Sequence, residues 1–151
     1  MIKNDISIKG EYFFYSKGKL IGKQKNTLIY LQVVNLINAL LGYTPADTII
    51  RYCALGTGTT PATINDSTLE TEGARVYRVD LRRTGNVVTS DFTFTELQAV
   101  GTWTEVGLFC GATATDTANT GLLWSRAIIT PSIIKASGSE LTVRHVTTWS
   151  Y

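Results

Sequence analysis

The sequence predicts a mainly β, single-domain antiparallel β-sandwich of jelly-roll-like type, with an N-terminal β-hairpin and one apolar α-helix. Three observations support this fold class. Only 17% of the 151 residues are charged, against about a quarter in ordinary globular chains. About one residue in seven is threonine, a β-branched residue favoured on pleated, half-exposed surfaces. Short apolar runs also recur between turn signals about every 8–12 residues, the spacing typical of a sandwich or jelly roll.

Residues 5–25 are expected to form the hairpin. The run Glu11-Tyr12-Phe13-Phe14-Tyr15 is rich in aromatic strand formers. The segment 16–19 contains a glycine that can adopt the positive φ of a tight turn. Leu20 then begins the return strand.

The charge of the chain is unevenly placed. Up to residue 26 there are six lysines and two acidic residues, a net charge of +4, whereas the eight basic and ten acidic residues that follow give −2. We therefore divide the chain into a basic hairpin arm, 1–26, and a sandwich domain, 27–151, within one compact unit. The arm is either a solvated basic surface or a contact with an acidic partner. Its candidate interface residues are Lys17, Lys19 and Lys23.

Residues 27–42 form the one predicted helix. Asn26 or Thr27 can cap its start, and Gly42 fits the left-handed position that follows a helix. Its polar residues make one narrow stripe: Gln32, Asn35 and Asn38. A helix that is apolar on most other sides is normally buried on more than one face. It is therefore either sandwiched within its own domain or partly a subunit interface, with candidates Leu28, Leu31 and Val34.

Six strands are expected after the helix, at 49–55, 74–83, 87–95, 102–110, 122–130 and 141–149. Strict alternation of apolar and polar residues in the second and third of them indicates a sheet with one wet face. Pro131 indicates an edge or a bulge at the end of the fifth. Asp66, Glu70 and Glu72 lie close together in the sequence and could in principle bind Ca²⁺, but they do not follow an EF-hand spacing and are expected to be solvated loop carboxylates.

The sequence shows no arrangement typical of an active site, so we expect no enzyme activity, cofactor or metal. His145 is the only histidine and shares a strand face with Leu141 and Val143, which indicates the core. A serine paired with His145 is a remaining catalytic alternative. Cys53 and Cys110 are expected to be buried thiols, and the sequence leaves open whether they form a disulfide. No apolar run reaches the about 18 residues of a membrane span.

Three tryptophans supply an alternative binding function. Aromatic rings on strands are more often core or interface residues, but exposed ones can stack on sugars. A glycan- or receptor-binding module would use the candidates Trp103, Trp124 and Trp149.

The order of short motifs along the chain resembles a group of small tailed-bacteriophage virion proteins, encoded among tail, neck and fibre genes. The resemblance covers nearly the whole chain. The motifs are ALGTG at 54–58, TLETEGAR at 68–75, EVGLF at 105–109, GLLWSR at 121–126 and LTV at 141–143.

This resemblance implies a non-enzymatic structural protein of the virion, assembled in the host cytoplasm. It would act through contacts with other virion proteins at the tail, the neck or collar, or the fibre attachment. It would be a homo-oligomer, as a ring or trimer, without nucleic-acid or membrane partners. Within the shared motifs, two candidate ion pairs would pin loops to the sheet, Glu72 with Arg75 and Glu105 with Arg126.

Overall fold

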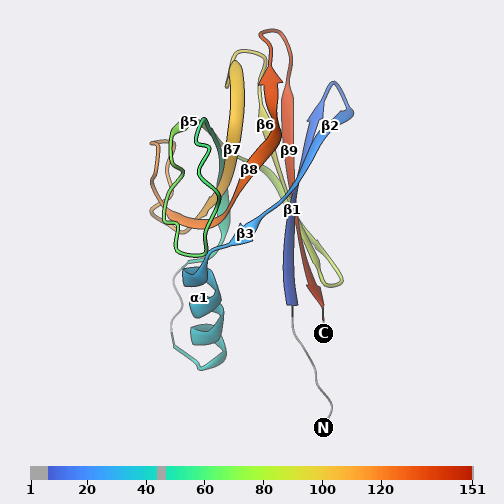
Figure 1. Cartoon of the computed structure of the whole chain (residues 1–151). Coiled ribbons are helices and arrows are strands. Elements are labelled where there is room, and N and C mark those ends of the chain that lie inside the picture. The colour runs from blue at the N-terminus through green and yellow to red at the C-terminus, as the bar shows by residue number, and fades with distance from the viewer. Residues whose placement is uncertain (1–6, 44–46, 151) are drawn as a thin grey trace.

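The strands form one antiparallel, nearly closed sheet, which confirms the predicted mainly β, single-domain class. The computed structural model describes residues 7–43 and 47–150, and Figure 1 shows its architecture. Within these residues the strands run in the order β2-β1-β9-β6-β5-β4-β7-β8-β3. Their bounds, with the helix, are β1 Ser7–Ser16, β2 Lys19–Lys25, β3 Thr27–Leu28, α1 Tyr30–Leu40, β4 Ile50–Gly56, β5 Glu72–Thr84, β6 Val87–Phe94, β7 Gly101–Cys110, β8 Leu122–Lys135 and β9 Leu141–Ser150.

Two corners divide this sheet into the two layers of a sandwich. The long strand β5 makes one corner, because residues 72–77 pair with β4 while residues 78–84 pair with β6. At the other corner β2 pairs with β1, and the chain then continues through Asn26 into β3, which pairs with β8. Both layers are therefore joined by continuous backbone on both sides.

The N-terminal hairpin, which we assigned to the basic arm 1–26, is integral to the sheet. β1 pairs with β9 along its whole length, from Ser7 opposite Ser150 to Ser16 opposite Leu141. The reason lies in the aromatic run, whose inward members Tyr12 and Phe14 are completely buried. The predicted turn is present, with φ of 49° at Lys17 and 74° at Gly18. Residues 1–6 lie outside the described part of the chain.

The predicted strands are present, and β8 extends five residues further than expected. β8 continues through Pro131 to Lys135, with the predicted bulge in its pairing with β7. The pairing of β5 with β6 has a register shift between Arg78 and Asp80, which interrupts the predicted alternation. Val79 lies at this shift and is 68% exposed, and Leu81, which follows it, is 38% exposed.

The core occupies the space between the two layers, and a smaller second core lies on the outer face of β4, β7 and β8. The main core combines aromatic and aliphatic side chains, including Tyr12, Phe14, Leu55, Phe92, Phe94, Leu108, Leu141 and Val143. The second core consists of Ile29, Ala54, Leu69, Phe109, Ala114 and Leu123. Two long loops, 57–71 and 111–121, contribute Leu69 and Ala114 to it, so they are part of the packed structure.

A buried polar contact fixes the corner between β2 and β3. The backbone N–H of Asn26 donates to the carbonyl of Gly10 at 3.1 Å, and its side-chain Nδ2 donates to Nε2 of His145 at 3.1 Å. A Cβ on Gly10 would lie 2.3 Å from Oδ1 of Asn26, so a larger residue there would displace the Asn26 side chain. His145 is 1% exposed, as its predicted core position requires. Burial lowers its pKa from 6.5 to about 3, so the ring is neutral at physiological pH.

The free energy of unfolding is expected to fall as the pH drops from about 6.5 toward 3, because His145 ionises more readily in the unfolded chain. Its pKa is about 3 when folded and near its ordinary 6.5 when unfolded, so in this window the unfolded chain binds one proton more. The loss approaches about 1.4 kcal/mol per pH unit. Urea unfolding between about pH 7 and 5 measures it, above the range where ordinary carboxyl groups titrate.

The control for this effect is His145→Gln, which keeps a polar group beside Asn26 but does not titrate. Its unfolding free energy should be nearly constant over the same pH range. A variant with the slope of the unmodified protein would show that other groups cause it.

Candidate functional site

The helix begins three residues later than predicted. Thr27 and Leu28 form β3 and pair with Arg126 and Ser125 of β8. The N-cap is therefore Ile29, without a side-chain cap, and not Asn26 or Thr27. Leu28 packs against the main core and does not belong to the helix, which corrects its place among the interface candidates. The end is as predicted, with Gly42 at φ 78°.

Polar side chains attach the helix to the sheet. Gln32 is completely buried and its Nε2 donates to the carbonyl of Leu123 at 2.9 Å. Asn35, also buried, donates to Oε1 of Gln32 at 3.4 Å. Backbone bonds at the first turn complete the attachment, from Ile29 N–H to the Trp124 carbonyl and from Tyr30 N–H to the Ile64 carbonyl. Two residues of the polar stripe therefore face the protein.

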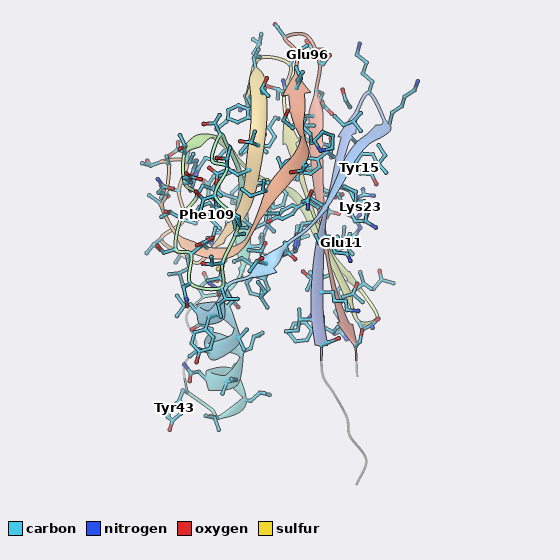
Figure 2. The ribbon with its side chains drawn as sticks, viewed as in Figure 1. Glu11, Tyr15, Lys23, Tyr43, Glu96 and Phe109 are labelled. Atoms are coloured by element: carbon cyan, nitrogen blue, oxygen red, sulfur yellow. The ribbon has the colours of Figure 1, made fainter. Side chains whose placement is uncertain are left out.

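The apolar residues of the helix face outward, so the expectation that it is sandwiched within its own domain is wrong. Figure 1 shows α1 extending away from the strands at one end of the molecule, and Figure 2 places Tyr43 at its far tip. The segment Tyr30–Leu40 contains no charged residue. Leu31 and Val34, the two remaining interface candidates, are exposed and half-buried. The large apolar side chains exposed here are Tyr30, Leu31, Ile37, Leu40, Leu41 and Tyr43.

A buried ion pair holds the 57–71 loop over the second core. Glu105 is completely buried, and its Oε2 accepts from Nε of Arg126 at 2.9 Å. The same carboxylate accepts three backbone N–H groups of the loop, those of Gly58, Glu70 and Thr71, at 3.0, 3.1 and 2.7 Å. Each oxygen of Glu105 thus has two donors, which offsets the desolvation of its charge. We call this arrangement the Glu105–Arg126 clamp.

Arg126 extends the clamp to two further carboxylates. Its Nη1 donates to Asp66 at 2.8 Å, and its Nη2 lies 3.7 Å from Glu70. Asp66 and Glu70 are therefore not simply solvated, as sequence alone suggested. The pKa of Glu70 is lowered, chiefly by the hydrogen bond from the Thr60 backbone N–H. Burial opposes ionisation of Asp66, but hydrogen bonds from Thr63 and Arg126 still lower its pKa.

Glycines of the ALGTG and EVGLF motifs make room for this clamp. A Cβ on Gly56 or Gly58 would lie 2.4 or 2.6 Å from Oε1 of Glu105. A Cβ on Gly107 would lie 2.7 Å from Leu69, which anchors the loop in the second core. The motifs ALGTG and EVGLF therefore meet in space around one carboxylate.

The second predicted pair meets in the same way and holds the 111–121 loop. The side chains of Glu72 and Arg75 are 1% and 3% exposed and are joined at 2.5 Å. Nη1 of Arg75 donates to the carbonyls of Thr115 and Thr120 at 2.8 and 3.1 Å, and Glu72 accepts the Asn119 N–H at 2.9 Å. The guanidinium also lies 4.4 Å from the ring centre of Phe109.

The lysine candidates lie on the exposed hairpin. Lys17 and Lys19 flank the turn and are exposed. Lys23 pairs with Glu11 at 3.2 Å and lies 5.1 Å from the ring centre of Phe13. Figure 2 shows the Lys23 and Glu11 side chains on neighbouring strands. The basic surface is therefore partly neutralised within the hairpin.

The three tryptophans do not form a common platform for a sugar. Trp103 and Trp124 are 7% and 6% exposed and belong to the main core, and Nε1 of Trp103 donates to the Ala99 carbonyl at 2.8 Å. Only Trp149 is partly exposed. The face of a ring that is buried in the core cannot stack on a ligand.

The thiols of the two cysteines and the groups that could bind a metal were the remaining candidates for a reactive site among the described residues. Cys53 and Cys110 are both free and buried; burial raises the pKa of Cys53 strongly and that of Cys110 to about 12, so neither is a thiolate at neutral pH. Over residues 7–43 and 47–150, His, Cys, Asp and Glu side chains form no group suited to holding a metal ion. No helix in this part of the chain is long and apolar enough to span a membrane.

Comparisons with known proteins identify no relatives of the chain. No protein-family model matches it, and no curated protein or solved structure shows significant similarity to it. The geometry of the clamps and of α1 therefore carries the functional argument.

Replacing Glu105 by Gln is expected to destabilise the fold by about 3 kcal/mol, because an amide N–H would face a donor and Arg126 would lose its charge partner. Urea unfolding measures the change. Limited proteolysis should also cut the 57–71 loop of the variant first.

The matched control is Asp80→Asn, which removes the same charge from an exposed ion pair with Arg82, where the two side chains are 50% and 42% exposed. Its stability and proteolysis pattern should be nearly unchanged. If Glu105→Gln behaved like this control, the clamp would not hold the loop.

Proposed function

We propose that the protein is a non-enzymatic structural component of a tailed-phage virion that acts through contacts with other virion proteins. The observation that carries the structural role is α1, an uncharged helix whose apolar side chains are turned toward solvent. Contiguous exposed apolar surface of this kind marks protein interaction sites. The phage context, at the tail, the neck or collar, or the fibre attachment, rests on the order of the shared motifs.

The buried charges support a structural role because they hold loops. Glu105, Arg126, Glu72 and Arg75 are each engaged by backbone groups or by each other, which leaves none of them available to a substrate. His145 is neutral and enclosed, with its ring nitrogens 3.1 Å from Asn26 and 3.4 Å from Thr147. These contacts favour a fixed framework over a serine–histidine mechanism.

A second surface with exposed apolar side chains lies at the opposite end of the molecule from α1, next to the exposed charged residues Lys17, Lys19 and Glu96. There the β1–β2 turn, the β6–β7 loop and the β8–β9 loop lie together (Figure 1). They and the adjoining strand ends expose Leu20, Ile21, Leu97, Val100 and Ile134. Surfaces with apolar and threonine side chains lose little solvation when covered, which suits a subunit with neighbours at both ends.

Particle incorporation tests the proposed role. A tagged copy expressed during infection by the source phage should co-purify with intact particles through a density gradient, and mass spectrometry should detect its peptides. Leu40→Asp, which places a charge on a side chain that is 88% exposed, should reduce incorporation at least about tenfold while leaving the fold intact.

Asp80→Asn, an exposed substitution on β5 and not on α1, is the control and should be incorporated normally. Absence of the unmodified protein from particles would contradict the virion role. Normal incorporation of Leu40→Asp would contradict the part played by the helix.

A further inference from the structure

The outward side of α1 carries a regular apolar seam. Successive residues of a helix are turned by 100°, so the positions opposite the buried Gln32 and Asn35 are Tyr30, Val34, Ile37 and Leu41. Their spacing of four, three and four residues is that of the contact seam between two packed helices. Tyr30, Ile37 and Leu41 are 57%, 49% and 65% exposed.

We propose that this seam packs against the same seam of other copies of the chain, in a closed bundle of three or more α1 helices. The inference rests on the proposed structural role and names the partner of that surface. A helix–helix contact is favoured because the four-, three- and four-residue spacing of the seam fits it. The attachment through Gln32 and Asn35 also leaves the opposite side of the helix accessible.

The absence of charge on the helix favours a copy of the chain as the partner. Tyr30–Leu40 has no acidic or basic residue, so identical helices meet without repulsion. A charged partner would find no complementary group on the seam. The one polar residue beside the seam, Asn38, can hydrogen-bond to its own counterpart across a symmetric contact, as single asparagines do in helical bundles.

The length of the helix favours more than two copies. An 11-residue helix is about 16 Å long, whereas a stable interface buries about 800 Å² on each partner. One helix pair is too small for this. Leu31 and Leu40 lie on opposite sides of the seam and are 46% and 88% exposed. Contact with two neighbours would cover both, as occurs in a closed bundle.

The solution mass of the full chain tests the bundle. Light scattering during gel filtration should give at least three times the monomer mass of 16.5 kDa. Ile37→Asp should weaken assembly on the order of 100-fold or more, because it gathers like charges at the centre of the bundle. Val79→Asp, on β5 and 68% exposed, is the matched control and should assemble normally.

A cross-link keeps the test decisive if Ile37→Asp does not fold. Under mild oxidation Ile37→Cys should form disulfide-linked dimers, while Val79→Cys should not, and the native Cys53 and Cys110 are buried. A monomeric or dimeric mass, assembly unaffected by Ile37→Asp, or no cross-link at position 37 would overturn the proposal. A monomer that still enters particles would refute only the bundle, whereas a bundle absent from particles would refute only the virion role.

Discussion

The ion pair between Glu105 and Arg126 is the interaction on which the outer half of the structure depends. It holds the 57–71 loop against the sheet, and that loop supplies Leu69 to the second core. The same loop supplies the Ile64 carbonyl that accepts the first N–H of α1. A change at Glu105 would therefore reach the helix through the loop, although no hydrogen bond joins the two directly. The 57–71 loop therefore connects the Glu105–Arg126 clamp to the first turn of α1.

The helix shows a polarity opposite to that of an ordinary surface helix, which turns its apolar stripe inward. Here Gln32 is buried because a strand carbonyl, that of Leu123, needs a donor at that place. A single well-bonded amide fixes the rotation of the helix, and the apolar positions then face outward. The described strands and loops leave those positions exposed, in keeping with the proposed role of the helix in contacts with other proteins. The orientation is thus a structural reason to expect association.

Local patterns predict the strands and the hairpin turn well, because alternation and turn chemistry act within a few residues. They could not show that β1 is central to the sheet, since its pairing with β9 joins residues over a hundred positions apart. The predicted start of the helix was wrong for a related reason. Thr27 and Leu28 are compatible with a helix in isolation, but they pair with β8. The Glu105–Arg126 and Glu72–Arg75 pairs were foreseeable from the motifs, whereas Asp66 and Gln32 had no sequence signal that separated them from solvated residues.

The residues that hold the loops and the outward residues of α1 differ in how freely they can be substituted. Gly56, Gly58 and Glu105 constrain each other sterically, so a substitution at one of them disturbs the others and with them the fold. The outward positions of α1 have no such partners within the described chain, and a substitution there leaves the framework intact. In the proposed role, the outward residues of α1 can therefore change independently of those that hold the loops. A charge-poor framework with a separately adjustable helix is suited to fitting different neighbours without refolding.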